Sequence, residues 1–204
     1  MLAPALPSLV LTESDYLAQE QSAKERHEYV DGQVFAMAGA SKTHNEIALN
    51  LALALRNLAK GSGCRVFMSD MKLRISQRNS YYYPDVLLTC EPNQEDSEYF
   101  VDRPCLVIEV VSKSTEWKDY HEKLLAYQSL SSVQNYWVVA QDRYEVTCFY
   151  RDQQGQWWVK TYTDLDQTLA VDCLQAALSL MEIYAGLQLA QNLKSYPCVR
   201  SHAR

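Results

Sequence analysis

The strongest constraint on the fold of this chain is a glutamate in the middle of an apolar run. Glu109 stands within Leu106–Val111, where every other residue is aliphatic. A run this continuous is typical of a strand that is buried on both faces. A buried carboxylate must be protonated, paired with a cation or bound to a metal, because an isolated buried charge is prohibitively costly. The chain must therefore bring a specific partner to Glu109.

A second carboxylate, Asp85, stands directly before the apolar run 86–88 and directly after Pro84. Proline suits the first residue of a strand, where no hydrogen-bond donor is needed, so Asp85 is expected near a strand end. If the strands of Asp85 and Glu109 are neighbours in one sheet, their carboxylates converge. Such a pair forms an oxygen-rich site for a hard divalent cation such as Mg²⁺ or Mn²⁺.

Helical spacing predicts that Lys123 is the cation beside this pair. It lies on the inward stripe of a predicted helix, whereas Lys113 and Lys118 fit solvated positions. The stripe repeats at i, i+4 and i+7 and consists of Tyr120, Leu124 and Tyr127. A lysine on this stripe can direct its ammonium group at the two carboxylates.

As an ordered set, these residues resemble the PD-(D/E)xK nuclease superfamily and, more narrowly, an uncharacterised bacterial family of restriction-endonuclease-like proteins. The likeness runs from about residue 11 to 187. The matching pieces are residues 28–32, 44–45, 83–86 and 108–112, and Lys123 with Tyr127. The superfamily pattern places a lysine two residues after the glutamate, where this chain has Val111. Members of the narrower family resemble this chain in supplying the lysine from the following helix, the position of Lys123.

The resemblance implies a restriction-endonuclease-like α/β fold, with a central mixed β-sheet flanked by α-helices. It also implies metal-dependent hydrolysis of phosphodiester bonds in nucleic acid, with DNA as the expected substrate. Asp85, Glu109 and a backbone carbonyl near Val110 are expected to hold Mg²⁺ or Mn²⁺. Lys123 is expected to orient the attacking water or to stabilise the transition state. The rival interpretation is a non-catalytic interaction or assembly protein, in which the same three charged side chains form a buried ion pair.

Four further residues are expected to support the site, each with a structural alternative. Glu28 is a third acidic group or an orienting residue, or else a solvent-facing strand residue. His44 contacts substrate phosphate or a carboxylate, or else it is a partly exposed surface residue. Ser112 binds phosphate or caps the helix that carries Lys123. Tyr127 accompanies Lys123 in the family pattern.

Periodicity and turn residues predict alternating helices and strands. The expected helices are 12–21, a helix opened by a capping box at 43–46 and ending at Gly61, the helix carrying Lys123, and 173–184. The expected strands are 27–30 and 33–37, joined by a turn at Asp31 and Gly32 that begins the sheet, then 64–68, 71–75, 86–88, 106–111, 136–140, 145–150 and 156–162.

One predicted strand has a basic face. Lys72 and Arg74 alternate with Met71, Leu73 and Ile75. With the neighbouring tyrosines 81–83, this face could follow a nucleic-acid backbone and stack bases. The alternative is a solvated strand face beside core tyrosines.

Length and composition indicate a single domain over residues 1–188 and a mobile tail over 189–204. The 204 residues are 48% hydrophobic, yet no apolar run is long enough to span a membrane, and residues 1–10 lack the features of a secretory signal. A cytoplasmic location is therefore expected. The net charge of −6 opposes indiscriminate nucleic-acid binding, although a locally basic face is compatible with it.

Two further expectations concern cysteines and assembly. The six cysteines form no CxxC motif and no cluster with histidine, so neither a disulfide framework nor a zinc site is expected. Trp137, Phe149, Trp157 and Trp158 are expected in the core or at a dimer contact, because exposed sheet edges need covering. A homodimer is the expected assembly.

Overall fold

The structure is a computed structural model that describes residues 10–37, 39–93, 97–112 and 119–189. Within these residues the strands form one sheet of six strands, one of five and one of two. The helices and short helical turns are α1 (Glu13–Ser22), α2 (Lys42–Leu58), η1 (Ser76–Arg78), η2 (Asp119–Lys123), α4 (Leu124–Gln128), η3 (Asp172–Leu174) and α5 (Leu180–Ile183).

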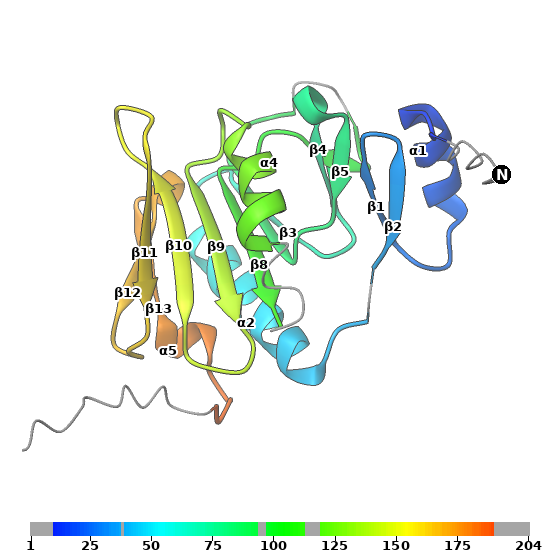
Figure 1. Cartoon of the computed structure of the whole chain (residues 1–204). Coiled ribbons are helices and arrows are strands. Elements are labelled where there is room, and N and C mark those ends of the chain that lie inside the picture. Colours follow the sequence, from blue (N-terminus) through cyan, green and yellow to red (C-terminus); the bar gives the residue numbers. More distant parts are fainter. Residues whose placement is uncertain (1–9, 38, 94–96, 113–118, 190–204) are drawn as a thin grey trace, which may run out of the picture.

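The six-stranded sheet is the centre of the fold (Figure 1). Its strands are, in spatial order, β11 (Trp157–Tyr162), β10 (Val146–Arg151), β9 (Asn135–Ala140), β8 (Leu106–Val111), β6 (Val86–Thr89) and β3 (Arg65–Met68). β8 and β9 run parallel, and the other neighbouring pairs are antiparallel. The predicted mixed sheet is therefore present, and β8 lies inside it with all of its residues buried.

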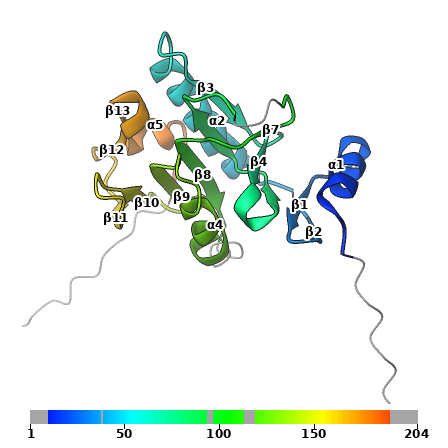
Figure 2. The ribbon, with the colours of Figure 1, turned by 90° about the horizontal axis from the view of Figure 1, so that it is seen from above.

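Alternation along β8 sends its side chains into two different cores. Leu106, Ile108 and Val110 join the core that contains α2, whereas Val107 and Val111 join the core that contains α4. Figures 1 and 2 show these two helices on opposite faces of the sheet. Glu109 lies between Ile108 and Val110 in the chain, so its side chain points to the opposite face of the sheet, the α4 face.

The helix α2 covers its face of the sheet with a regular apolar stripe. Ile47, Leu51 and Leu55 are fully buried, and each contributes about 1.5–3 kcal/mol by leaving water. The predicted capping box is wrong, because the N-cap is Ser41, whose hydroxyl accepts a hydrogen bond from the His44 N–H. Residue 43 therefore lies within the first turn.

The predicted N-terminal hairpin forms, but it belongs to a second sheet and not to the central one. Asp31 and Gly32 make its turn, both with positive φ, as the sequence indicates. The first hairpin strand pairs with a strand that precedes Asp85 in the chain. In spatial order this sheet contains β2 (Gln33–Ala36), β1 (His27–Val30), β5 (Ser80–Tyr82), β4 (Lys72–Ile75) and β7 (Phe100–Val101).

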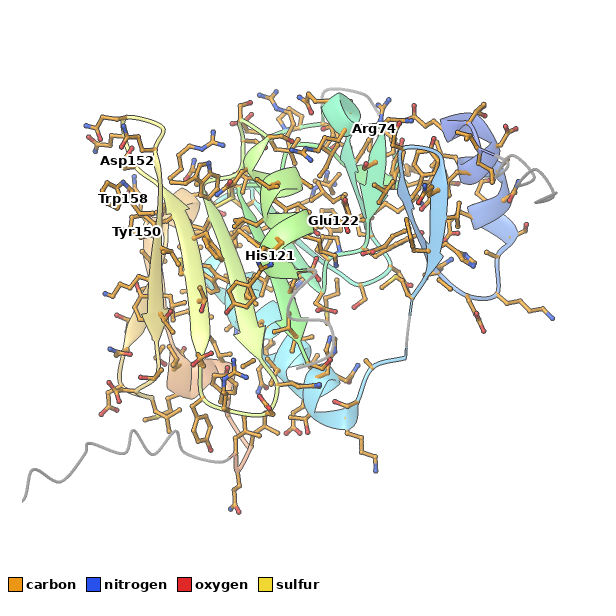
Figure 3. The ribbon with its side chains drawn as sticks, viewed as in Figure 1. Arg74, His121, Glu122, Tyr150, Asp152 and Trp158 are labelled. Carbon is orange, nitrogen blue, oxygen red and sulfur yellow. A yellow bond between two sulfur atoms is a disulfide. The ribbon has the colours of Figure 1, made fainter. Side chains whose placement is uncertain are left out.

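Lys72 and Arg74 do not form an open basic face. Lys72 is only 8% exposed, its ammonium lies 5.5 Å from the centre of the Tyr83 ring, and burial lowers the pKa of this lysine. Arg74 pairs with Glu13 of α1 at 3.0 Å and covers the Phe100 ring (Figure 3). The expectation of a solvated strand face is therefore wrong, because α1 and its neighbours cover this side of β4. Tyrosines 81–83 lie in the core, as the same alternative predicts.

The predicted C-terminal helix 173–184 is also wrong. The chain forms η3, reverses at Gln175, which has a positive φ of 51°, and continues as a strand. This strand, β13 (Ala176–Ser179), pairs with β12 (Thr168–Val171). Only the short α5 remains helical, opened by a capping box between Ser179 and Glu182. The apolar spacing of this segment is compatible with either structure, and pairing with β12 decides it.

The cysteines depart from expectation as well. Cys64 is joined to Cys90, and Cys105 to Cys173, so the expectation of no disulfides is wrong for these four. Cys148 is buried as a small hydrophobic residue. Spacing in the sequence carries no sign of this pairing, because the partners are 26 and 68 residues apart.

The aromatic residues of the sheet divide between core and surface. Trp137 is fully buried, whereas Trp158 on the outermost strand β11 is 53% exposed. Its indole N–H donates to Asp152 at 2.7 Å, near the tip of the β10–β11 hairpin (Figure 3). The homodimer contact expected at this edge stays a prediction.

Several expectations fall on other parts of the chain. Lys113 and Lys118 lie outside the described residues, as does the expected tail beyond Leu189. None of the helices in the described ranges is both long and apolar enough to cross a membrane. The assignment of residues 1–188 to one domain stays a prediction.

Candidate active site

Neighbouring strands bring Asp85 and Glu109 to the same place. Val86 of β6 pairs with Ile108 of β8, so one further step of this antiparallel register sets Asp85 opposite Glu109. Leu87 and Val107 lie in the α4-side core, and residues two positions away share their face. Asp85 is 9% exposed and Glu109 4% exposed. The predicted carboxylate pair is thus assembled at a buried position.

Lys123 lies beside Glu109 of this pair. Its Nζ lies 2.9 Å from Glu109 Oε1, and the side chain is 7% exposed. Lys123 ends η2, a π-helical turn that leads directly into α4. A π turn holds one more residue per hydrogen-bonded ring than an α turn, and such turns are frequent at functional sites. The structure thus places Lys123 on the inward side, as the helical stripe predicts.

Glu28 completes an ion-pair network from the second sheet. Its Oε1 lies 3.1 Å from Lys123 Nζ, and the residue is 6% exposed. Glu28 is on β1, whereas Glu109 is on β8, so the lysine joins carboxylates of two different sheets. The solvent-facing alternative for Glu28 is therefore wrong.

Tyr127 of α4 orients Glu109. Its hydroxyl donates a hydrogen bond of 2.6 Å to Glu109 Oε1, the oxygen that also faces Lys123. Burial raises the pKa of Tyr127 well above its ordinary value, and the Glu109 carboxylate raises it further. The phenol consequently remains protonated and acts as a donor.

Asp85 is held by two different donors. The Val110 N–H donates to Asp85 Oδ2 at 2.7 Å, and His44 Nε2 lies 3.1 Å from the same oxygen. His44 stands in the first turn of α2, with its side chain against Asp85, directly before the start of β6. Of its predicted alternatives, the structure favours support of a carboxylate over a surface position. The role of the Val110 carbonyl as a metal ligand stays a prediction.

Tyr82 and Glu122 also border the site, although the sequence indicates Tyr82 only as a neighbour of the basic strand and does not indicate Glu122. The Tyr82 ring centre lies 5.9 Å from Lys123 Nζ, and its hydroxyl donates to Glu122 Oε1 at 3.3 Å. Figure 3 shows Glu122 on η2, on the side of the second sheet. Burial, followed by Glu122, raises the pKa of Tyr82. The nearness of Tyr82 to Asp85 in the chain is the one signal that could have indicated it.

The balance of charge in this cluster favours a cation. Glu28, Asp85 and Glu109 supply three carboxylates against the single ammonium of Lys123. Carboxylate oxygens are the ligands that Mg²⁺ and Mn²⁺ prefer, and a bound divalent ion would offset the surplus negative charge. The donor set therefore fits a hard divalent cation.

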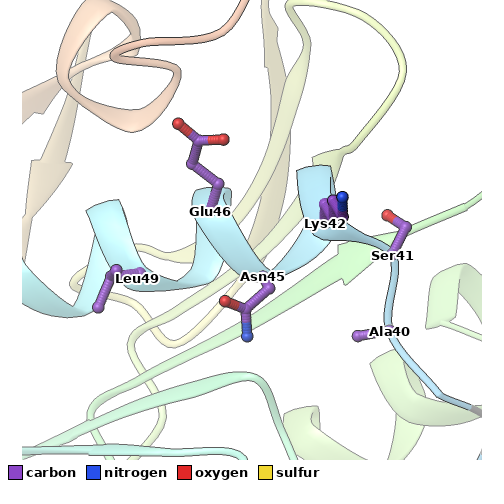
Figure 4. A pocket seen from close by; sticks show the side chains of 6 residues that line it. All are labelled: Ala40, Ser41, Lys42, Asn45, Glu46 and Leu49. Atoms are coloured by element: carbon purple, nitrogen blue, oxygen red, sulfur yellow. The ribbon is translucent and has the colours of Figure 1, made fainter.

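A surface hollow of about 540 Å³ adjoins the start of α2 (Figure 4). Its polar lining includes Lys42, Asn45 and Glu46, whose neighbour His44 contacts Asp85. Neither Asp85 nor Glu109 lines it. The first turn of α2 therefore offers one side chain to the carboxylate cluster and others to the open hollow. Ser112 follows β8 directly and is half-buried.

Comparison with known proteins finds a matching family and similar chains. A family model named Uma2 and described as "Putative restriction endonuclease" matches residues 13–184. The chain is 34% identical to the uncharacterized protein slr1290 of Synechocystis sp. over 185 residues, which cover 91% of this chain and 97% of the relative. It is 33% identical to sll1609 of the same organism over 150 residues, covering 72% and 85%.

A solved structure shares the fold. The crystal structure is described as that of a putative nuclease belonging to DUF820 from Anabaena variabilis, and it superposes with a TM-score of 0.69. The sequence identity is 16%, and the match covers 85% of this chain and 97% of the other. This likeness confirms the predicted restriction-endonuclease-like fold class.

Proposed function

The chain belongs to the Uma2 family, described as putative restriction endonucleases, and from this membership and the carboxylate cluster we propose that it is a metal-dependent nuclease. The observation that carries the proposal is the convergence of Asp85 and Glu109 at one buried place, with Lys123 Nζ 2.9 Å from Glu109. The proposed reaction is hydrolysis of a phosphodiester bond in nucleic acid, with DNA as the substrate.

The proposed metal ligands are Asp85, Glu109 and the backbone carbonyl near Val110. A bound Mg²⁺ or Mn²⁺ supplies a water of lowered pKa and neutralises charge that builds on the phosphate. His44 keeps Asp85 in place through its contact at 3.1 Å. Tyr127 does the same for Glu109 through its donated hydrogen bond. Ligands that are fixed beforehand need no reorganisation during the reaction.

Lys123 is the proposed catalytic cation. Its positively charged side chain faces Glu109. The superfamily pattern has a lysine two residues after the glutamate, where this chain has Val111, and in the proposal Lys123 takes the role of that lysine. Its ammonium can donate to the attacking water or to a phosphoryl oxygen while it remains near the metal ligands. Glu28 limits the positions open to this ammonium group, because it holds Lys123 from the side of the second sheet.

The second candidate function is a non-catalytic assembly protein on the same scaffold. The contacts of Lys123 with both Glu28 and Glu109 favour it, because a buried ion pair of this kind can be purely structural. The two functions differ in what a divalent cation does. A nuclease needs the cation for turnover, whereas the ion pair is complete without it.

The test is cleavage of supercoiled plasmid and of single-stranded DNA and RNA with Mg²⁺ or Mn²⁺, compared with a chelator. The wild-type chain should cleave at least one of these only with the cation, and Asp85→Asn and Glu109→Gln should abolish cleavage. Asp166→Asn is the matched control, because Asp166 is an exposed carboxylate between β11 and β12. Cleavage that survives both site substitutions would show that the carboxylates are not catalytic and that the activity lies elsewhere.

A further inference from the structure

Four cysteines gather at the opposite end of the central sheet from the carboxylates. Cys64 directly precedes β3, Cys90 directly follows β6, and Cys105 directly precedes β8. Because β6 runs antiparallel to both neighbours, these three positions lie together at the same end of the three strands. Cys173 reaches this end of the sheet from η3. We call these four residues the cysteine cluster.

The cysteine cluster is separate from the candidate active site. Asp85 stands at the start of β6 and Cys90 at its end, five residues apart, which corresponds to roughly 16 Å of extended strand. Glu109 and Cys105 are likewise toward opposite ends of β8. No residue belongs to both groups.

The two disulfides lie close to each other. Cys64 is bonded to Cys90, and Cys105 to Cys173. Across the two pairs, Cys90 Sγ lies 3.8 Å from Cys105 Sγ. The sulfurs of Cys90, Cys105 and Cys173 all lie within 4.8 Å of one another. The pairs therefore form one group of sulfurs.

The sulfurs of Cys90, Cys105 and Cys173 are spaced like one face of a mononuclear tetrahedral metal site, and Cys64 adjoins this face through its bond to Cys90. Zinc binds four cysteine sulfurs in a tetrahedron with Zn–S bonds of about 2.3 Å, which gives sulfur–sulfur edges of about 3.8 Å. A cluster of several iron ions would separate the sulfurs further, because the irons lie between them. An all-sulfur set selects a soft or borderline cation and is unsuited to Mg²⁺.

We propose that the cysteine cluster, when reduced, binds one Zn²⁺ ion through four thiolates. Cys105 is buried, Cys64 and Cys173 are half-buried and Cys90 is exposed, so the ion has a path of entry through Cys90. Reduction of each disulfide by a thiol or phosphine reductant takes two electrons and two protons and yields two thiols. Each thiol then releases its proton as its sulfur binds the ion.

Zinc at this place would have a structural role. The site joins the ends of three adjacent strands of the central sheet to η3, which leads into β13. The β12–β13 hairpin would then be anchored to the sheet by the ion as well as by its apolar contacts. A closed set of four thiolates leaves no open position for substrate, which is typical of structural zinc sites.

Co²⁺ is a visible probe of this site. The full-length chain is reduced with a phosphine, freed of metal and titrated anaerobically with Co²⁺. We expect saturation at one Co²⁺ per chain in the thiolate site, with thiolate-to-cobalt charge-transfer absorption, the intense visible bands of tetrahedral Co²⁺, and loss of both when Zn²⁺ is added. Reduced wild-type protein without these bands would overturn the proposal.

Variants assign the ligands. Cys90→Ser/Cys173→Ser removes one sulfur from each pair and should eliminate the charge-transfer bands, whereas Cys148→Ala, outside the cysteine cluster, should retain them. Retention by the double variant would also overturn the proposal. If circular dichroism shows the double variant unfolded, the single variant Cys90→Ser at the exposed position is used, and it should lose the four-sulfur spectrum. Glu109→Gln should leave the spectrum unchanged, which separates this result from the fate of the nuclease proposal.

Discussion

Lys123 Nζ lies 2.9 Å from Glu109 Oε1, although one residue belongs to a π-helical turn and the other to a central strand. The lysine two residues after the glutamate in the superfamily pattern is Val111 here, and Val111 is buried in the core of the α4 face. The cation therefore approaches the carboxylate from a neighbouring element and not along the strand. Several consequences of this arrangement can be measured.

Lys123→Met should suppress cleavage while leaving metal binding intact. Methionine retains the apolar length of the side chain and removes the ammonium, so electrostatic stabilisation worth about 10²- to 10³-fold in rate should be lost. Turnover with Mg²⁺ and calorimetric binding of Mn²⁺ are measured on the same preparation. Lys160→Met, on the exposed strand β11, serves as the control. Loss of Mn²⁺ binding in Lys123→Met would instead make the lysine a structural residue.

Glu109→Gln should strongly weaken the binding of Mn²⁺. The amide has the shape of the carboxylate but lacks its charge, so one ligand and part of the attraction for the cation disappear. We expect saturable binding in calorimetric titration of the wild-type chain. In the variant the affinity should fall by more than the 10- to 100-fold that is typical of an outer-sphere partner, about two orders of magnitude or more. Equal affinities would remove Glu109 from the ligand set.

His44→Ala should weaken Mn²⁺ binding by about 10- to 100-fold, because His44 orients Asp85 through a contact of 3.1 Å. His121→Ala is the matched control, since His121 is an exposed histidine on η2 (Figure 3). Both variants are titrated with Mn²⁺ under identical conditions. An unchanged affinity in His44→Ala would assign the histidine a role other than positioning Asp85.

Tyr127 should make the free energy of unfolding fall at alkaline pH. Its pKa is raised in the folded chain above the ordinary value of 10.0, so the folded state retains a proton that the unfolded state loses. The stabilisation is present below about pH 10 and is lost as pH rises further, by up to about 1.4 kcal/mol per pH unit.

Tyr127→Phe should therefore reduce this alkaline slope by one proton. Denaturant unfolding at several pH values between about 8 and 11 measures the difference against the wild-type chain. The variant also removes one of the donors to Glu109 Oε1, where Lys123 Nζ remains, and this loss should cost about 1–3 kcal/mol at neutral pH. Identical slopes in the two proteins would show that Tyr127 titrates alike in the folded and unfolded chains.

Gly32→Ala should destabilise the hairpin that carries Glu28. Gly32 has a φ of +90°, and an added Cβ would overlap Val10 Cγ1. The strain and the clash together should lower the free energy of unfolding by about 1–3 kcal/mol. Gly39→Ala is the control, because no atom lies within 4 Å of its would-be Cβ. Equal effects of the two substitutions would contradict this account.

Local sequence was sufficient for the elements on which the site stands. An apolar run around Glu109, a proline before Asp85 and a helical stripe through Lys123 each depend on residues close in the chain. The structure agrees with all three. A continuous apolar run specifies a strand that is buried on both faces, and helical spacing specifies which positions face inward. The turn at Asp31 and Gly32 was predictable for the same reason, since it requires positive φ.

Tertiary structure decided what lies on the other side of each element. In the sequence, Glu28 is compatible with an exposed strand face, but in the structure it is buried against Lys123. Lys72 is likewise compatible with a solvated face, but α1 and Tyr83 cover it. Segment 173–184 has spacing compatible with a helix, yet Ala176–Ser179 pair with β12 as a strand. Strand order brings Cys64, Cys90 and Cys105 together, and η3 adds Cys173. The physical reason is common to these cases: local periodicity specifies which face is apolar, but the partner of that face comes from distant parts of the chain.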